Sequence, residues 1–176
     1  TGKRAAFRPK LLLALPGGMA PSEQQTLVDV LVDAGVRSVV PVDEGVASAI
    51  GAGMRIDQPY GRMNIDIGGG RTNVSVFSFG HQIVWDILSV GGDRFDDAIS
   101  DYLRKKHNLL IGARTAEELK IDIGSARMRG VKLEMDACGR SLVSGLPRAV
   151  TVNSEEMIEA LDEPLRDLIN ALSRMI

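Results

Sequence analysis

The stretch IDIGGGRTNVSVF, residues 65–77, contains residue types whose spacing suits phosphate chemistry. Gly68, Gly69 and Gly70 directly follow an apolar–acidic–apolar triplet. Because glycine has no side chain, the backbone N–H groups of such a run can approach an oxyanion closely and cradle a phosphate. Glycine runs also bend ordinary hairpins, so the three glycines alone leave both interpretations open.

The residues after the glycines exclude two familiar phosphate-binding loops. A Walker loop ends in Gly-Lys-Ser/Thr and continues into a helix, whereas Gly70 is followed by Arg71 and Thr72. A dinucleotide-binding loop also leads into a helix. Residues 73–79 instead alternate polar and apolar side chains, which is typical of a half-buried strand. The remaining phosphate-binding arrangement is a strand–glycine turn–strand hairpin whose amides face the anion.

Asp66 is an acid in an otherwise apolar strand, two residues before the glycine turn. A carboxylate at this position could hold Mg²⁺, usually through ordered water, beside nucleotide phosphates. It could equally cap the turn by hydrogen-bonding to its own backbone. The local sequence favours neither role.

Strands and helices alternate upstream of this hairpin. Residues 11–15, LLLAL, predict a short buried strand. A helix is expected to begin at Pro21 and to stop where Gly35 can adopt a left-handed cap conformation. Residues 36–45 predict a second strand, and residues 46–53 a short helix of small residues. This alternation indicates an α/β layer arrangement.

The rhythm changes at the hairpin itself. Three strand-like segments follow one another closely, at residues 63–67, 73–80 and 81–90, and a tight turn is expected at Gly80 and His81.

Helices and short strands are expected in the rest of the chain. A helix should run from about Arg94 to His107. Residues 115–118, TAEE, have the spacing of a capping box and predict another helix that ends near Gly124. Short strands are expected within residues 131–152, and residues 153–156, NSEE, should cap a final amphipathic helix.

The composition excludes several classes of function. A net charge of −2 and 4% aromatic residues give no basic or stacking surface for nucleic acid. The single cysteine, Cys138, excludes an internal disulfide and suits a reducing cytosol. The longest apolar run, residues 11–15, is too short to cross a bilayer.

Six strings in this sequence resemble the rod-shape-determining MreB family, within the actin and heat-shock chaperone ATPase superfamily. They appear in family order over roughly residues 10–165: VDEGVASAIGAG, IDIGGG, GGDRFDDAI, LIGARTAEELKIDIGSA, SGLPR and NSEEMIEAL. The resemblance implies an actin-like ATPase fold, which is ribonuclease H-like, with two lobes and a cleft that binds ATP with Mg²⁺. It implies that residues 1–56 are the end of the first lobe and residues 57–176 the second lobe, with an inserted small subdomain at 94–150.

The resemblance also implies roles for individual residues. Asp66 matches the acid that organises the metal, through water, and Glu44 matches the glutamate that positions or activates the attacking water. The remaining positions match contacts to the nucleotide: Gly68, Gly69, Gly70, Arg71 and Thr72 in the phosphate loop, Gly92 in the loop that opens the inserted subdomain, and Glu117 and Lys120 beside the ribose and adenine. Without the resemblance, Glu117 and Lys120 are best explained as a surface ion pair on one helical face.

The sequence departs from the family pattern at several places. Gly45 stands where a proline is usual, which removes a rigid residue beside Glu44. Arg71 stands where a threonine is usual, and it could clamp phosphate or point outward. Asp122 shortens what is usually a glutamate. The family's earlier Asp-x-Gly loop and its later triple-glycine motif are absent from this partial chain, so the chain alone is expected not to hydrolyse ATP.

The resemblance implies a cytoskeletal ATPase that forms ATP-dependent, head-to-tail filaments and organises cell-wall synthesis. Its implied partners are itself and membrane-associated cell-wall synthesis proteins, without nucleic acid, in a cytoplasmic location that extends to the membrane surface. No membrane-binding element is identifiable in this chain. A non-hydrolysing actin-fold scaffold is the alternative that Gly45 and Arg71 favour. A chaperone-type or sugar-kinase ATPase is a third reading, which the strings LIGARTAEELK and SGLPR oppose.

Overall fold

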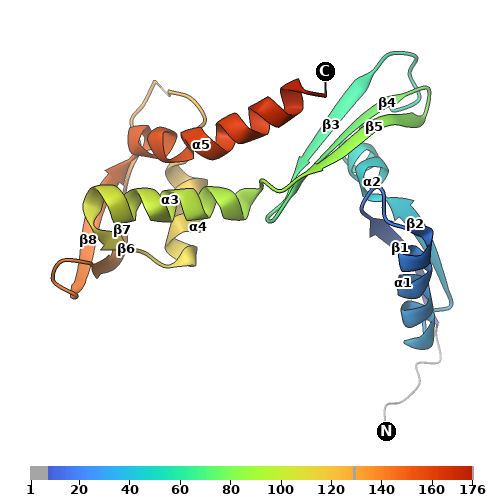
Figure 1. Ribbon diagram of the computed structural model, residues 1–176, viewed down its shortest axis with the longest axis horizontal. Helices are drawn as coiled ribbons and strands as arrows, with labels where there is room; N and C mark the ends of the chain where they lie inside the picture. Colours follow the sequence, from blue (N-terminus) through green and yellow to red (C-terminus); the bar gives the residue numbers. More distant parts are fainter. Residues whose placement is uncertain (1–7, 129, 176) are drawn as a thin grey trace, which may run out of the picture. The chain divides into compact units, whose positions relative to one another are not determined.

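The computed structural model describes residues 8–128 and 130–175 (Figure 1). Their contacts divide into two compact units. The first comprises the described residues up to Asp66 together with Asn73–Ile87, and the second comprises Ile67–Thr72 and the described residues from Leu88 onward. The division into lobes at residues 56 and 57, with a subdomain at 94–150, stays a prediction, and its first seven residues lie outside the described chain.

The first unit begins with the predicted alternation of strands and helices. Strand β1 (Lys10–Leu15) pairs in parallel with β2 (Ser38–Asp43), and α1 (Pro21–Asp33) connects them. Helix α2 (Glu44–Gly51) follows β2 without a loop. Leu15 lies opposite Asp43 in the register, so the two strands deliver the chain segments that follow them to one edge of the sheet.

Helix α1 ends as the sequence predicts. Gly35 has a φ of 107°, and its amide donates to the Val32 carbonyl at 2.9 Å. The amide of Val36 donates to the Leu31 carbonyl at 3.1 Å. These two bonds form a Schellman cap, which requires a left-handed residue that glycine adopts without steric cost. The predicted stop at Gly35 is confirmed.

The glycine-rich hairpin belongs to a three-stranded sheet with the order β3-β4-β5. Its strands are β3 (Arg62–Ile67), β4 (Thr72–Ser78) and β5 (His81–Leu88). A strand rather than a helix therefore follows Gly70, as predicted. The tight turn between β4 and β5 lies one residue earlier than predicted, at Phe79 and Gly80, because these two residues adopt positive φ angles of 50° and 77°.

Helix α2 packs on this sheet within the first unit. The Asn64 side chain donates to Ser48 Oγ at 2.8 Å. Asp43 caps the helix, since its Oδ1 accepts the amides of Gly45 at 2.8 Å and Val46 at 3.2 Å. Gly45 is buried against Ser75, whose Oγ lies 2.2 Å from the place where a Cβ at Gly45 would be.

The second unit packs three helices around a small antiparallel sheet. The helices are α3 (Gly92–His107), α4 (Ala113–Ile123) and α5 (Ser154–Ser173), and the sheet contains β6 (Leu109–Leu110), β7 (Glu134–Ser141) and β8 (Pro147–Asn153). Helices α3 and α5 run side by side (Figure 1). Their facing side chains form one buried core with those of α4 and β8, which includes Ile99, Leu103, Leu119, Val152 and Met157.

The start of α5 confirms the predicted cap at residues 153–156, whereas the start of α4 corrects the predicted capping box. Asn153 Oδ1 accepts the amides of Glu155 and Glu156, and the Glu156 carboxylate accepts the amide of Asn153 at 3.2 Å. The capping box predicted at residues 115–118 is wrong, because α4 already begins at Ala113 after the extended residue Gly112. Its spacing is the ordinary i, i+3 spacing inside a helix.

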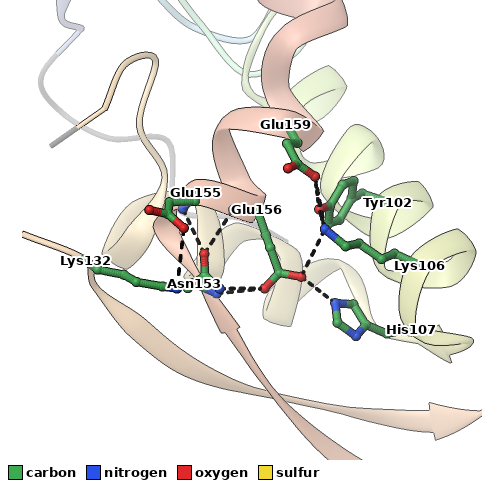
Figure 2. Close-up of polar contacts among 8 residues, drawn as sticks. All are labelled: Tyr102, Lys106, His107, Lys132, Asn153, Glu155, Glu156 and Glu159. Atoms are coloured by element: carbon green, nitrogen blue, oxygen red, sulfur yellow. Dashed lines mark hydrogen bonds and ion pairs between the residues drawn. The ribbon is translucent and has the colours of Figure 1, made fainter.

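A polar network joins the end of α3 to the start of α5 (Figure 2). His107 Nε2 lies 2.7 Å from Glu156, and the Lys106 ammonium lies 3.0 Å from Glu159. The Tyr102 hydroxyl contacts both Lys106 and Glu159. Hydrogen bonds with Tyr102 and Glu159 raise the pKa of Lys106, and those from Tyr102 and Lys106 lower the pKa of Glu159.

We expect Glu159→Gln to make the free energy of unfolding less dependent on pH in the acidic range. A carboxyl whose pKa is lower in the folded state stabilises the protein when the pH is above 4.5, its ordinary pKa. This contribution is lost as the pH falls through the pKa of the folded state. Urea unfolding should therefore show the variant less stable than wild type near neutral pH, with the gap closing below about pH 4.5. Asp167→Asn, an exposed residue of α5, should show no such gap. A gap that does not narrow as the pH falls below 4.5 would contradict the assignment.

We expect Gly45→Ala to destabilise the protein by about 1–3 kcal/mol, because the new Cβ would overlap Ser75 Oγ. Combining it with Ser75→Ala should recover part of the loss, since the hydroxyl is then gone. Gly51→Ala is the matched control, because nothing lies within 4 Å of a Cβ at that end of the same helix. Thermal and urea unfolding of the three variants measure this. Equal effects at Gly45 and Gly51 would show that Ser75 does not impose the glycine.

Candidate functional site

The glycine turn between β3 and β4 is a closed and exposed loop. The amide of Gly68 donates to the Arg71 carbonyl at 2.9 Å, and residues 68–71 are all exposed. Thr72 differs, since its side chain is fully buried and its hydroxyl donates to the Val90 carbonyl at 2.6 Å. Thr72 therefore fixes the end of the loop to the backbone at Val90. A direct contact of Thr72 with a nucleotide stays a prediction.

The carbonyl groups of this loop face the start of α3. The amide of Gly92 donates to the Gly68 carbonyl and that of Asp93 to the Gly69 carbonyl, each at 2.9 Å. A Cβ at Gly91 would lie 2.3 Å from the Gly69 oxygen and 2.7 Å from the Gly68 oxygen. Only glycine at position 91 allows this approach.

The amide groups of the loop remain available. Within the part of the chain that the structure describes, the N–H groups of Gly69 and Gly70 have no hydrogen-bond acceptor. Two such amides on an exposed turn are the donors that an anion-binding loop uses. A side chain at Gly69 would come within 3.3 Å of the Asp93 carboxylate, which lies beside the turn.

Lys120 and Glu117 do not form the surface ion pair that their helical spacing alone would suggest. The Lys120 ammonium lies 2.8 Å from Asp96 Oδ2 and donates to the Gly92 carbonyl at 3.3 Å. Glu117 is exposed, and no residue in the described ranges pairs with it. Asp96 lies in the string GGDRFDDAI, but no motif predicts its role, because Lys120 is 24 residues away in the sequence.

Asp66 and Glu44 both belong to the first unit. The Asp66 side chain is half-buried and makes no hydrogen bond with any described residue, so the structure gives no support to a turn-capping role. Glu44 is the first residue of α2, half-buried, directly after the capping residue Asp43. Whether they act on metal and water stays a prediction.

The acidic residues suit a cation that is held mainly by water and phosphate. In the described ranges, no three His, Cys, Asp or Glu side chains gather closely enough to bind a metal directly. Mg²⁺ commonly keeps several waters and uses one or two carboxylates together with substrate phosphates. A single carboxylate such as Asp66 fits that pattern.

The first unit also contains an aromatic contact that no motif predicts. Trp85 of β5 lies over the Gly17–Gly18 turn, where a Cβ at Gly18 would come within 2.2 Å of the indole. A small cavity of about 10 Å³ next to it is lined by Glu44 and Ser75, among others. The glycine pair is the only local signal in the sequence for this contact.

Within residues 8–128 and 130–175, no helix combines the length and the apolar character that crossing a membrane requires.

The chain is similar to several known proteins over more than nine-tenths of its length. The cell shape-determining protein MreB of Escherichia coli K12 is 40% identical over 164 residues, which are 93% of this chain and 47% of that protein. MreB5 of Spiroplasma citri aligns in its ADP-bound and AMPPNP-bound crystal structures with TM-scores of 0.89 and 0.87, at 35% and 36% identity. These alignments cover 94% and 93% of this chain and 50% and 49% of MreB5.

The MamK double helical filament shares the fold alone, with a TM-score of 0.71 and 16% identity over 95% of this chain and 49% of MamK. The predicted actin-like fold is thereby confirmed, and the chain spans about half the length of the relatives it matches. The sequence model of the MreB/Mbl protein family matches residues 1–176, and the chain therefore belongs to this family.

Proposed function

We propose that the protein is a rod shape-determining, actin-like cytoskeletal ATPase whose ATP-dependent filaments organise cell-wall synthesis. The observation that carries the proposal is the exposed turn at residues 68–71, which keeps the amides of Gly69 and Gly70 free for an anion. The relatives named for cell shape and the binding of ADP and AMPPNP by MreB5 support it.

The chain's residues would divide the work of binding and hydrolysis. Gly68, Gly69 and Gly70 present backbone donors to the phosphates, and the Arg71 guanidinium adds positive charge at the end of the turn. Gly92 supports the turn because its backbone N–H donates a hydrogen bond to the Gly68 carbonyl. Glu117 and Lys120 on α4 would flank the ribose and adenine.

Two acids would serve the reaction itself. Asp66 would hold Mg²⁺ through water, and the bound cation would neutralise charge on the phosphates. Glu44 would orient the attacking water and accept its proton, which requires hydrogen-bond reach to that water. Asp43 fixes the start of α2 and therefore the backbone from which the Glu44 side chain extends.

Self-association would follow head to tail, because identical subunits that meet through two different surfaces form open filaments when the rotation does not close. The filament would lie in the cytoplasm and work with membrane-associated proteins of cell-wall synthesis. The scaffold alternative finds no support among the related proteins, whose names and bound nucleotides favour the filament reading.

Glu44→Ala should lower ATP hydrolysis by about 100-fold, because the attacking water loses its base. AMPPNP affinity should change little, since backbone donors and Arg71 hold the phosphates. Phosphate release and titration calorimetry on the protein from its complete reading frame measure the two effects. Glu23→Ala, on exposed α1, is the control. Unchanged turnover in Glu44→Ala would remove its assigned role.

Gly91→Ala should weaken AMPPNP binding by more than about tenfold, because a Cβ within 2.3 Å of the Gly69 oxygen must displace the phosphate loop. Gly112→Ala is the matched control, since this residue also directly precedes a helix and nothing lies within 4 Å of its Cβ position. Circular dichroism establishes that both variants fold. Equal affinity of the two variants would mean that the loop does not bind the phosphates.

A further inference from the structure

The Lys120 ammonium is held in a defined orientation. Its side chain is 23% exposed, and it donates to Asp96 Oδ2 at 2.8 Å and to the Gly92 carbonyl at 3.3 Å. An ammonium has three N–H donors at tetrahedral angles. Two fixed acceptors therefore also fix the direction of the third N–H, which has no acceptor among the described residues.

Asp96 is the stronger of these two acceptors. Its side chain is 16% exposed, and it carries the charge opposite to that of Lys120. Its other oxygen, Oδ1, is buried and has no hydrogen-bond partner among the described residues. Buried acceptors without a donor are uncommon. The position of this carboxylate therefore needs an explanation other than the hydrogen bonding of Oδ1.

This pair sits where the phosphate loop meets the helices. The Gly92 carbonyl accepts a hydrogen bond from the Lys120 ammonium, and the Gly92 amide donates one to the Gly68 carbonyl. Helices α3 and α4, which carry Asp96 and Lys120, are locked together by buried side chains such as Ile99 and Leu119. The ammonium therefore has a fixed place relative to the turn that would hold the phosphates.

We propose that Asp96 is a positioning residue of the nucleotide site, and this inference rests on the proposed function. Asp96 holds the Lys120 ammonium against the first turn of α3, so that the remaining N–H is directed at an acceptor on the ribose or the base of a bound nucleotide. Without the carboxylate, the flexible four-carbon stem of the lysine lets the ammonium turn toward water.

The experiment compares a nucleotide with a polyphosphate that lacks the nucleoside, which is the part that Asp96 serves. AMPPNP carries a nucleoside, whereas inorganic tripolyphosphate carries phosphates alone. Calorimetric dissociation constants are measured for wild type, Asp96→Asn and Asp97→Asn in the protein from its complete reading frame. Asp97 is the matched control, because it is exposed, adjacent in α3 and unpaired among the described residues.

Asp96→Asn should weaken AMPPNP binding by about tenfold and tripolyphosphate binding by less than about twofold, since the backbone bonds between the loop and α3 remain. Asp97→Asn should change neither. Lys120→Met should reproduce the loss, and the double variant should lose no more than either single variant.

The other possible results each overturn either the positioning role of Asp96 or the proposed function. If Asp96→Asn weakens both ligands equally, the residue only maintains the loop, and the positioning role is overturned. If it behaves as Asp97→Asn does, the role is likewise overturned while the proposed function stands. If wild type binds neither ligand, the proposed function itself fails and the inference fails with it.

Discussion

The close approach of the glycine turn to the start of α3 is the constraint on which the site depends. Gly91 lies so near the carbonyls of Gly68 and Gly69 that any larger residue would overlap them. This contact lets the first two amides of α3 bond to the turn at 2.9 Å. The turn therefore has one orientation, with its carbonyls toward the helix and its free amides elsewhere.

The same contact decides which group could bind an anion. The first-turn amides of a helix are ordinarily free to hold phosphate. In α3 they are occupied, because Gly92 and Asp93 donate to the turn and the amides of Arg94 and Phe95 donate to the Gly91 carbonyl. Any anion bound here would therefore be held by the glycine turn and not by the helix end. This distinguishes the site from a Walker loop, in which turn and helix bind phosphate together.

Local rules predicted most elements, but they misplaced one helix start and could not predict contacts between residues distant in sequence. Gly35 and Asn153 follow cap chemistry that a few consecutive residues determine, and the structure contains both caps. Thr115 has the same kind of local signal but lies inside a helix, since i, i+3 spacing alone does not mark an end. The pairing of Lys120 with Asp96 could not be predicted, because it depends on how two helices pack.

The contact between Gly45 and Ser75 changes the meaning of the clearest departure from the family pattern. From the sequence, Gly45 in place of the usual proline predicts a less rigid backbone beside Glu44. In the structure Ser75 Oγ occupies the space of a Cβ at position 45, and Asp43 accepts the Gly45 amide at 2.8 Å. A proline at this position would offer no N–H to that carboxylate. Capping by Asp43 thus supplies the restraint that a proline ring would give, and Gly45 alone is no argument for a site that has lost its chemistry.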